Sequence, residues 1–437
     1  MTQQNVLAKP TKTASGETKS QQRKSLAPSI LSRPQKIATI VLICQAIFPL
    51  LIAGLSDEHG RRPVLIVSLI VCIAINIGLA RQITFAGFMV LRCLQSCGAS
   101  GVSVVAVATV NDIIRPVERT EYRIFTSVAY SLAPITCPIF GGLLAQYFGW
   151  PGIFYFQGVL AALLLVLVIF FHHETCRAQV GDGSVPPKIW NRPIMNILRL
   201  LPSTNPNFET QFLPKRRLTP FQTIKLAFRR PALLLILFQA ILFGGSIAII
   251  ITIPALFVRR FHFNVIELGA THLAYALGGF TSRWIFVPLS DANIERHKRL
   301  AGVNEESEQS SNKSFDRARL QVIIPTVYLG CALVVGYGWI MHYEVHVSGP
   351  IVILFFLGNA LIGGASLLTG LMLHLHPQQP ASALAAMNSF RFLCAAGTAA
   401  AANSIIKAVG TGWMGTIIAL GYFGASGLLW VMYVCGH

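Results

Sequence analysis

Arginine occurs at three positions inside long apolar stretches of this chain, Arg92, Arg283 and Arg391. A charge within hydrocarbon is costly, so it indicates a pathway for a polar compound unless the side chain reaches the membrane edge or pairs with backbone carbonyls. Gln95 follows Arg92 by three residues and Asn388 precedes Arg391 by three, so each pair shares one face of a helix. We therefore expect Arg92 and Arg391 to be functional. For Arg283, nearer a helix end, both interpretations stay open.

Other polar residues within apolar stretches could line the same pathway, with aromatic and aliphatic neighbours taking the hydrophobic part of a substrate. The expected lining is Gln45, Arg92, Gln95, Gln239, His272, Tyr275, Asn359, Asn388 and Arg391. The sequence shows no nucleophile with a base, no metal-ligand spacing and no phosphate-binding loop, and its nine cysteines lack paired spacing. We expect neither an enzyme nor a bound metal or cofactor.

The composition predicts an all-α integral membrane protein. The chain has 437 residues, of which 53% are hydrophobic and 12% charged, whereas a soluble protein has about 25% charged residues. The net charge of +18 is spread over loops, which favours a membrane protein over a partner of nucleic acid. Eleven apolar segments are predicted as helices, at 37–55, 63–80, 85–110, 124–147, 150–171, 231–257, 268–289, 320–341, 349–373, 381–406 and 413–435.

These segments fall into two groups. Residues 1–36 form a polar, basic tail that is predicted to be disordered, and residues 37–171 form an N-terminal helical bundle. Residues 172–230 form a central loop with ten basic residues and a short amphipathic helix near Phe221 to Phe228, and residues 231–437 form a C-terminal bundle. Basic residues prefer the cytosolic side, so the central loop is predicted to be cytosolic.

Short polar motifs join the segments. The loop Gly54-Leu-Ser-Asp57-Glu58-His59-Gly60-Arg61-Arg62-Pro63 connects the first two, and Leu289-Ser290-Asp291 repeats part of it in the second group. Asp112 opens a further acidic and basic loop, for which gating and simple solvation are nearly equal interpretations. In the fourth segment, Pro134 and Pro138 are expected to bend the helix, while Gly141 and Gly142 allow another helix to approach closely.

These motifs resemble those of the major facilitator superfamily. The Gly54 to Pro63 loop resembles the loop between its second and third helices, with Glu58 where a basic residue is usual. Arg92 to Gln95 resembles its fourth-helix signature, and Pro134 to Gly142 resembles its antiporter motif, with Cys137 in the first Gly position. The chain is most similar to the fungal drug:proton antiporters, in the branch of quinidine-resistance proteins and dityrosine exporters.

The resemblance implies a major facilitator fold of two bundles. It also implies a monomeric, multi-pass protein of the plasma membrane that exports small amphipathic organic compounds in exchange for protons. Alternating access would expose the site to each side in turn. All 17 acidic residues lie in tails, loops or helix rims, so the candidate proton carriers are His272, His374, Asp57 and Asp112. Alternatives are an importer or polyamine-type carrier, and a truncated membrane protein that does not transport.

The repeated Leu-Ser-Asp motif also indicates that the first of twelve helices is missing before Ile37. In the second group the motif follows the second segment, but in the first group it follows the first segment. With five and six segments, the basic tail and its seven Lys and Arg residues would lie outside the cell, against the charge rule.

Overall fold

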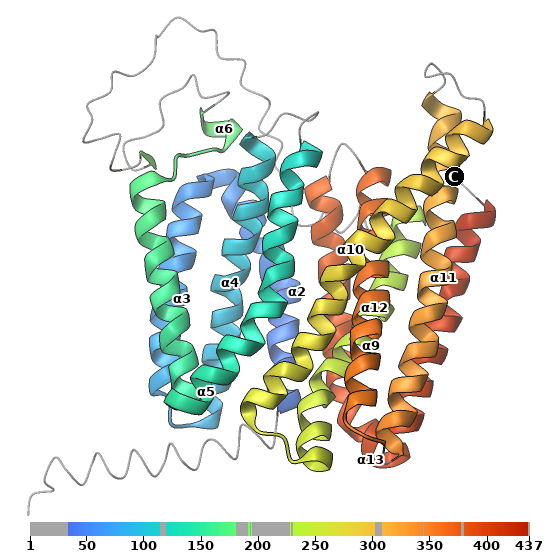
Figure 1. Ribbon diagram of the computed structural model, residues 1–437. Coiled ribbons are helices and arrows are strands. Elements are labelled where there is room, and N and C mark those ends of the chain that lie inside the picture. The colour runs from blue at the N-terminus through green and yellow to red at the C-terminus, as the bar shows by residue number, and fades with distance from the viewer. Residues whose placement is uncertain are drawn as a thin grey trace, which may run out of the picture.

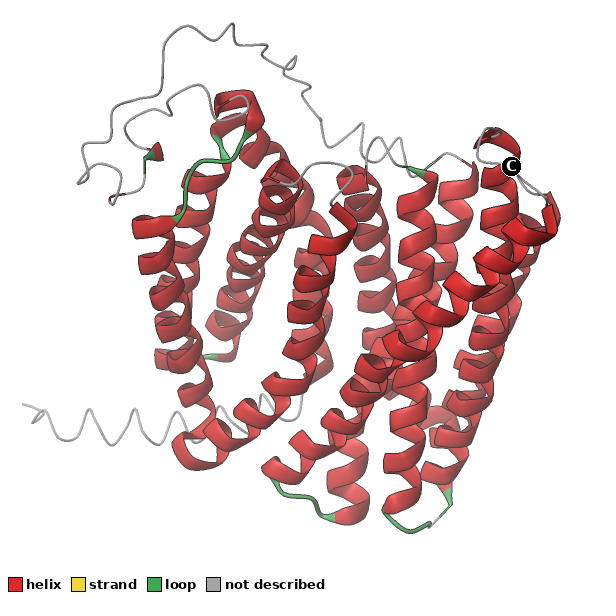
Figure 2. Ribbon diagram, turned by 45° about the horizontal axis from the view of Figure 1, so that its top comes forward, coloured by secondary structure: helices red, strands yellow, loops and turns green. Residues whose placement is uncertain are grey.

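The computed structural model describes residues 34–113, 119–180, 230–301, 308–343, 345–376 and 380–435, together with residues 191, 192, 194 and 228. These residues are helical or lie in short connections at helix ends, and no strand occurs among them (Figure 2). The predicted amphipathic helix near Phe221 and nearly all of the basic tail lie outside the described residues. The prediction of an all-helical protein is confirmed for the part that is described.

The helices form two groups that stand side by side (Figure 1). The first group, called here the N-half, contains α2 (Pro34–His59), α3 (Arg61–Arg81), α4 (Phe85–Ile113), α5 (Arg119–Phe171) and the short α6 (Arg177–Val180). The second group, the C-half, contains α9 (Arg230–Phe261), α10 (Val265–Ala301), α11 (Glu308–His342), α12 (Ser348–Leu375) and α13 (Pro380–Cys435).

Two of these helices reverse direction at a glycine. Gly149 in α5 has a φ of 70° and Gly410 in α13 has a φ of 83°, and both are non-helical. Positive φ is accessible to glycine without the steric cost that other residues meet. Each helix therefore runs through its half twice, and the predicted boundaries near residues 148 and 410 coincide with these turns (Figure 1).

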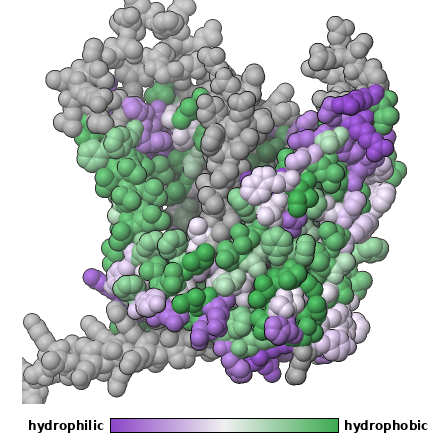
Figure 3. All heavy atoms as spheres, in the orientation of Figure 1, coloured by the Kyte–Doolittle hydropathy of each residue, from purple (hydrophilic) through white to green (hydrophobic). Residues whose placement is uncertain are grey.

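The surface of the described residues suits a lipid environment. Hydrophobic residues cover the middle of both halves, and hydrophilic residues gather toward the ends of the helices (Figure 3). Eight helical stretches among the described residues are long and apolar enough to cross a membrane, and two of them, of 36 and 52 residues, contain the turns at Gly149 and Gly410. The chain is therefore a multi-pass membrane protein.

Helices α10 and α11 extend further than predicted. The segment ending at residue 289 continues as α10 to Ala301, and α11 begins at Glu308 rather than near residue 320. Helical residues beyond the apolar core can face water, and Glu295 and Arg299 pair at i and i+4 on that exposed turn. Asp291, predicted in a loop, therefore lies within a helix.

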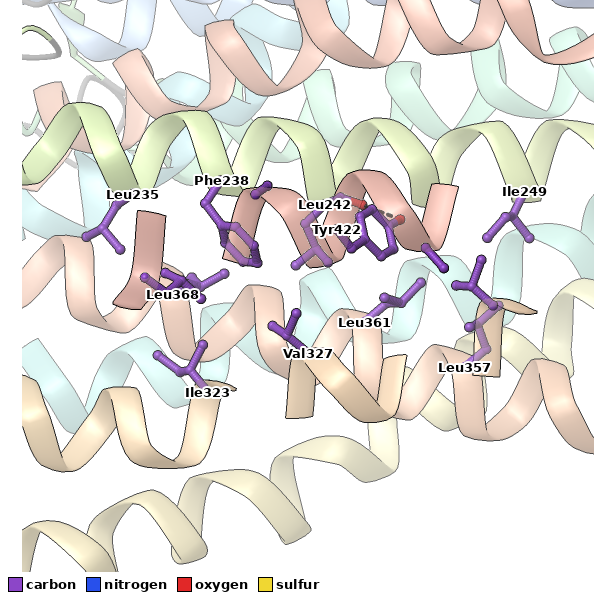
Figure 4. Close-up of a cluster of buried hydrophobic side chains, with 14 of the residues drawn as sticks. Leu235, Phe238, Leu242, Ile249, Ile323, Val327, Leu357, Leu361, Leu368 and Tyr422 are labelled. Carbon is purple, nitrogen blue, oxygen red and sulfur yellow. Dashed lines mark hydrogen bonds between the residues drawn. The ribbon is translucent and has the colours of Figure 1, made fainter. Parts of the chain in front are cut away.

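The largest apolar core lies within the C-half. Leu235 and Phe238 of α9, Val327 of α11 and Leu361 of α12 pack together (Figure 4). Tyr422 of α13 inserts into the same cluster, and its hydroxyl donates a 2.9 Å hydrogen bond to the carbonyl of Leu242. The N-half contains smaller clusters, one of them around Leu79, Phe88 and Phe154. The C-half is therefore the more tightly packed body.

Within the described residues, the two halves meet mainly through two helix pairs, α2 with α13 and α5 with α10. The second pair uses the motif predicted for close approach. A Cβ at Gly142 would lie 3.3 Å from the carbonyl oxygen of Val265, and a Cβ at Gly269 would lie 2.7 Å from that of Pro138. Gly141 departs from the expectation, because a Cβ there would meet nothing within 4 Å; the α10 backbone passes on the Gly142 side only.

Helices α10 and α12 cross closely at Gly278 and Gly358. A Cβ at Gly278 would overlap the carbonyl oxygen of Phe355, and one at Gly358 would overlap that of Tyr275. We expect Gly278→Ala to lower the unfolding temperature of the purified protein, because overpacking reduces the free energy of unfolding by about 1–3 kcal/mol or more. Gly370→Ala, on α12 but with nothing within 4 Å, is the control. Equal unfolding temperatures for the two variants would contradict the close crossing.

Candidate functional site

Arg92 anchors a polar cluster inside the N-half. Its Nη1 donates a 3.0 Å hydrogen bond to Oε1 of Gln95, as the sequence predicted. Gln95 Nε2 lies 2.7 Å from Oδ1 of Asn76 on α3 and 3.0 Å from Oε1 of Gln157 on the second run of α5. These four residues, here called the N-half polar cluster, connect three helices. Asn76 and Gln157 were not predicted, although each is a polar residue inside an apolar segment, which is a usable signal.

Aromatic rings hold the Arg92 guanidinium in place. Its Cζ lies 4.7 Å from the ring centre of Phe154 and 5.3 Å from that of Phe88. Those two rings and Trp150 pack edge to face, with centres 6.0–6.1 Å apart. An arginine over a ring is stabilised by about 0.5–2 kcal/mol when it is shielded from water. The Nε atom is buried and has no hydrogen-bond partner among the described residues.

Arg391 is held in a similar way in the C-half. Its Cζ lies 4.3 Å from the ring centre of Phe243 on α9 and 5.4 Å from that of Phe392. The expected pairing with Asn388 is not present, because the guanidinium stacks on Phe243 instead of turning along its own helix. Within the described part of the chain, Arg391 donates no hydrogen bond, and its Nε is buried without a partner.

Two residues of the predicted lining are packed inside the C-half. The Gln239 side chain is fully buried, and its Nε2 donates to the carbonyl of Ala365 at 3.5 Å, while its Oε1 lacks a partner in the described chain. Tyr275 is 7% exposed and lies in the main apolar cluster. Neither side chain reaches an open surface in this conformation.

Of three further residues of the predicted lining, His272 and Gln45 are partly exposed and Asn359 is buried. His272 Nδ1 lies 2.9 Å from the carbonyl of Leu268, one turn earlier in α10. Asn359 Nδ2 donates to Oγ1 of Thr281 at 3.1 Å and is 8% exposed, so it joins α12 to α10. Gln45 is half-buried on α2. The predicted lining is therefore distributed over both halves instead of gathered at one point.

At the end of the N-half next to α6, Arg61 connects the first loop to α4. Its Nε donates to Oδ2 of Asp112 at 2.8 Å, and its Nη1 donates to the Ser56 hydroxyl at 3.0 Å. The motif residue Asp57 lies in α2, but its side chain is outside the described part. A Cβ at Gly54 would meet nothing within 4 Å. Arg61 therefore joins the start of α3 to Asp112 of α4, a contact that the sequence did not predict.

Glu174, which sequence reasoning missed, caps the N-terminus of α3. Its carboxylate accepts hydrogen bonds from the backbone N–H of Arg61 at 2.8 Å and of Arg62 at 3.2 Å, and also from Thr175 and Cys176. A carboxylate at this position satisfies free N–H groups and complements the helix dipole. Glu174 is 6% exposed. An acid directly after the end of an apolar segment was the available signal.

The cap also explains the glycine before α3. Gly60 has a φ of 102°, and a Cβ there would lie 2.6 Å from Oε2 of Glu174. Arg62 Nη2 donates to the carbonyl of Ile169 at 3.0 Å, which joins α3 to the end of α5. Burial lowers the pKa of the neighbouring His172 below its ordinary value, although the Glu174 carboxylate opposes that shift.

The corresponding end of the C-half is built differently. Asp291 is exposed on α10, and Asn293 donates to the carbonyl of Ala318 at 2.7 Å. His374 Nδ1 of α12 lies 3.5 Å from Oδ1 of Asp316 on α11. The repeated Leu-Ser-Asp motif therefore does not repeat the tight turn of the first loop, because α10 continues past it.

Comparison with known proteins gives consistent similarities. The family model described as Major Facilitator Superfamily matches residues 34–399. The chain is 34% identical to "MFS-type transporter R5" of a Phoma species, over 91% of this chain and 77% of that protein. It is 24% identical to "Citrate exporter 1" of Aspergillus niger, over 85% and 72%. Its fold matches the human organic anion transporter MFSD10 (TETRAN), with a TM-score of 0.56, 18% identity and coverage of 91% and 83%.

Proposed function

The chain belongs to the Major Facilitator Superfamily, and we propose that it is a proton-coupled exporter of small amphipathic organic compounds that works by alternating access. It is a membrane transporter and not an enzyme, as its family and its fungal MFS-type relatives show. Its family leaves open the direction of transport, the coupling ion and the class of transported compound, and for these we propose export, protons and amphipathic organic compounds.

The packing contact between the two halves supports the proposal of alternating access. Only two helix pairs, α2 with α13 and α5 with α10, make extensive contacts across it within the described residues. The α5–α10 pair packs through Gly142 and Gly269, where small residues allow backbones to slide or pivot closely. Two packed bodies with a narrow shared contact are suited to rocking about a central site.

Export in exchange for protons is supported by the resemblance of the Pro134 to Gly142 motif to that of antiporters. The name of the Aspergillus niger relative also describes export. Of the candidate proton carriers, Asp112 is paired with Arg61 and His272 is bonded to its own helix. His374 Nδ1 lies 3.5 Å from a carboxylate oxygen of Asp316, and we assign proton uptake and release to this pair, because it joins an imidazole and a carboxylate from two different helices.

The test is transport in inside-out membrane vesicles from a host that lacks related exporters. A proton gradient, acid inside, should drive uptake of amphipathic dyes, and nigericin, which collapses the gradient, should abolish it. Vesicles without the protein are the control. Uptake that ignores the pH gradient would favour an uncoupled carrier or importer. The absence of any uptake would favour a membrane protein that does not transport.

We also propose that the protein lies in the plasma membrane with residues 172–230 in the cytosol, between an N-terminal bundle at 37–171 and a C-terminal bundle at 231–437. The loops on the side of this segment carry 21 of the 35 Lys and Arg residues, and those on the other side carry 4. Asn312-Lys313-Ser314 is a glycosylation acceptor pattern on the same side. We expect no glycan at Asn312 in a secretory-pathway host, and a glycan there would invert this topology.

A division into five and six spans, with the first of twelve helices absent, remains part of the proposal. Gln157 of the N-half polar cluster is exposed, although its apolar segment lies within the membrane. A further helix packed beside it would cover this polar edge. Sequencing full-length messenger RNA across the first 40 codons tests the point, and an additional apolar stretch of about 20 residues is expected there. A message without one would contradict it.

A further inference from the structure

We propose that the transported compound is an amphipathic carboxylate, and that Arg92 and Arg391 bind its charged group from the two halves. This inference rests on the proposed transport function and specifies its substrate class. Four observations support it: the distribution of acids, the way each guanidinium is held, the depth of the two residues and the apolar surfaces beside them.

The two arginines have no acidic residue near them in the sequence. No Asp or Glu occurs between Glu58 and Asp112, where Arg92 lies, or after Glu344, where Arg391 lies. Among the described residues, neither guanidinium forms an ion pair. A cation inside a membrane protein without a partner is strongly unfavourable, so an anion supplied from outside the chain would relieve that cost.

The way the guanidinium groups are held leaves donors free for such an anion. Phenylalanine rings cover the flat faces of Arg92 and Arg391, and stacking does not use the N–H groups at the edge of the plane. Arg391 donates no hydrogen bond through its Nη atoms within the described chain, and Arg92 uses only Nη1, toward Gln95. An in-plane pair of free donors matches the two oxygens of a carboxylate.

Arg92 lies at the depth of Cys44 in the membrane. Helix α2 packs against α4, and Cys44 of α2 lies close to Cys93, the residue that follows Arg92 on α4. Gln45, the next residue of α2, is half-buried and adds an amide at this level. The position is remote from both ends of α2, which runs from Pro34 to His59.

Arg391 lies at the same depth on α13, which also packs against α2. The Thr39 hydroxyl donates to the carbonyl of Ala396 at 3.5 Å, and α2 is antiparallel to the first run of α13 (Figure 1). Five residues forward from Thr39 to Cys44, and five back from Ala396 to Arg391, each rise about 7.5 Å. The two arginines therefore lie at one level on α4 and α13, the two helices that pack most extensively against α2, and we infer that a substrate between the halves meets both.

The surroundings also favour an amphipathic compound over a small inorganic anion. Phe88, Phe154 and Trp150 lie beside Arg92, and Phe243 and Phe392 lie beside Arg391. Such rings favour apolar parts of a ligand next to its charge. The mid-membrane depth of both residues also separates them from lipid headgroups, which lie at the membrane edge.

The test compares two labelled probes with one aromatic body, 4-(1-pyrenyl)butyrate and 4-(1-pyrenyl)butylamine. Binding is measured on the purified full-length protein by scintillation proximity, and uptake is measured in the vesicles described above. We expect the butyrate to bind and the amine not to bind. Arg391→Gln and Arg92→Gln should each raise the Kd for the butyrate about tenfold or more, because each removes a charged hydrogen-bonding partner. Arg391→Lys should raise the Kd for the butyrate by a smaller factor, since lysine keeps the positive charge.

Arg283→Gln is the matched control, because Arg283 is an arginine inside an apolar stretch but outside this pair. The Kd of this variant for the butyrate should stay at the wild-type value. Transport of the amine with no binding of the butyrate would overturn the carboxylate assignment and leave the transport function standing. Binding of the butyrate without transport of either probe would support the assignment and contradict the transport function. Equal competition by inorganic phosphate would also overturn it, since the site would then select charge alone.

Discussion

Replacing Arg92 by alanine is expected to abolish transport while the protein still reaches the membrane. Arg92 is the only charge in the N-half polar cluster, and its guanidinium is fixed by Gln95 and by the rings of Phe88 and Phe154. Alanine removes the charge and the donors but leaves the glutamine network that joins α3, α4 and α5. We expect the transport rate to fall on the order of a hundredfold, as for the loss of two charged hydrogen bonds.

Arg92→Lys separates charge from shape. Lysine keeps a positive charge at this depth, but it lacks the planar fork that stacks on the rings and donates in pairs. Partial transport is therefore expected from the lysine variant, with a larger effect on KM than on the amount of protein in the membrane. Vesicle uptake normalised to the protein content of the membrane is the measurement.

Ser96→Ala is the matched control for Arg92. Ser96 lies one turn further along α4 and is buried, and its hydroxyl donates only to the Arg92 carbonyl. Its removal changes the same turn of the helix without touching the guanidinium. Normal transport by Arg92→Ala would show that Arg92 is a packing residue. Equal losses in both variants would show that the turn, and not the charge, matters.

The sequence predicted the helices well because their signal is local. An apolar run of sufficient length folds as a helix in a membrane whatever lies beside it. The pairing of Arg92 with Gln95 was predictable for the same reason, since both are on one helix. The extensions of α10 and α11 were missed because polar residues beyond the apolar core can be helical or not, and sequence periodicity does not decide between them.

What the sequence could not predict depends on contacts between distant segments. Arg391 stacks on Phe243, which lies 148 positions earlier, so its expected pairing with Asn388 is not formed. Gly141 and Gly142 are equivalent in sequence, yet only Gly142 faces α10. Glu174 was missed because its partners are backbone N–H groups of α3, which carry no residue identity that a motif could show.

Glu174→Gln is expected to destabilise the N-half. The carboxylate accepts four backbone N–H hydrogen bonds, and two of them come from the first residues of α3. Glutamine keeps the size but removes the negative charge from the helix N-terminus, and its amide group can place a donor against N–H groups. We expect a loss of about 2–4 kcal/mol, from the helix dipole and the charged hydrogen bonds together. The measurement is thermal unfolding of the purified protein.

Glu58→Gln is the matched control, because Glu58 is an exposed acid at the C-terminal end of α2 that offers only its backbone carbonyl to Gln179. Its unfolding temperature should match that of the wild type, since a surface charge alone contributes little. Glu174→Asp distinguishes charge from reach: it keeps the charge but shortens the side chain by one methylene, so an intermediate loss is expected. If Glu174→Gln unfolds at the wild-type temperature, the N-terminus of α3 does not depend on this carboxylate. The tight turn at Gly60 would then be maintained by the Arg61–Asp112 pair.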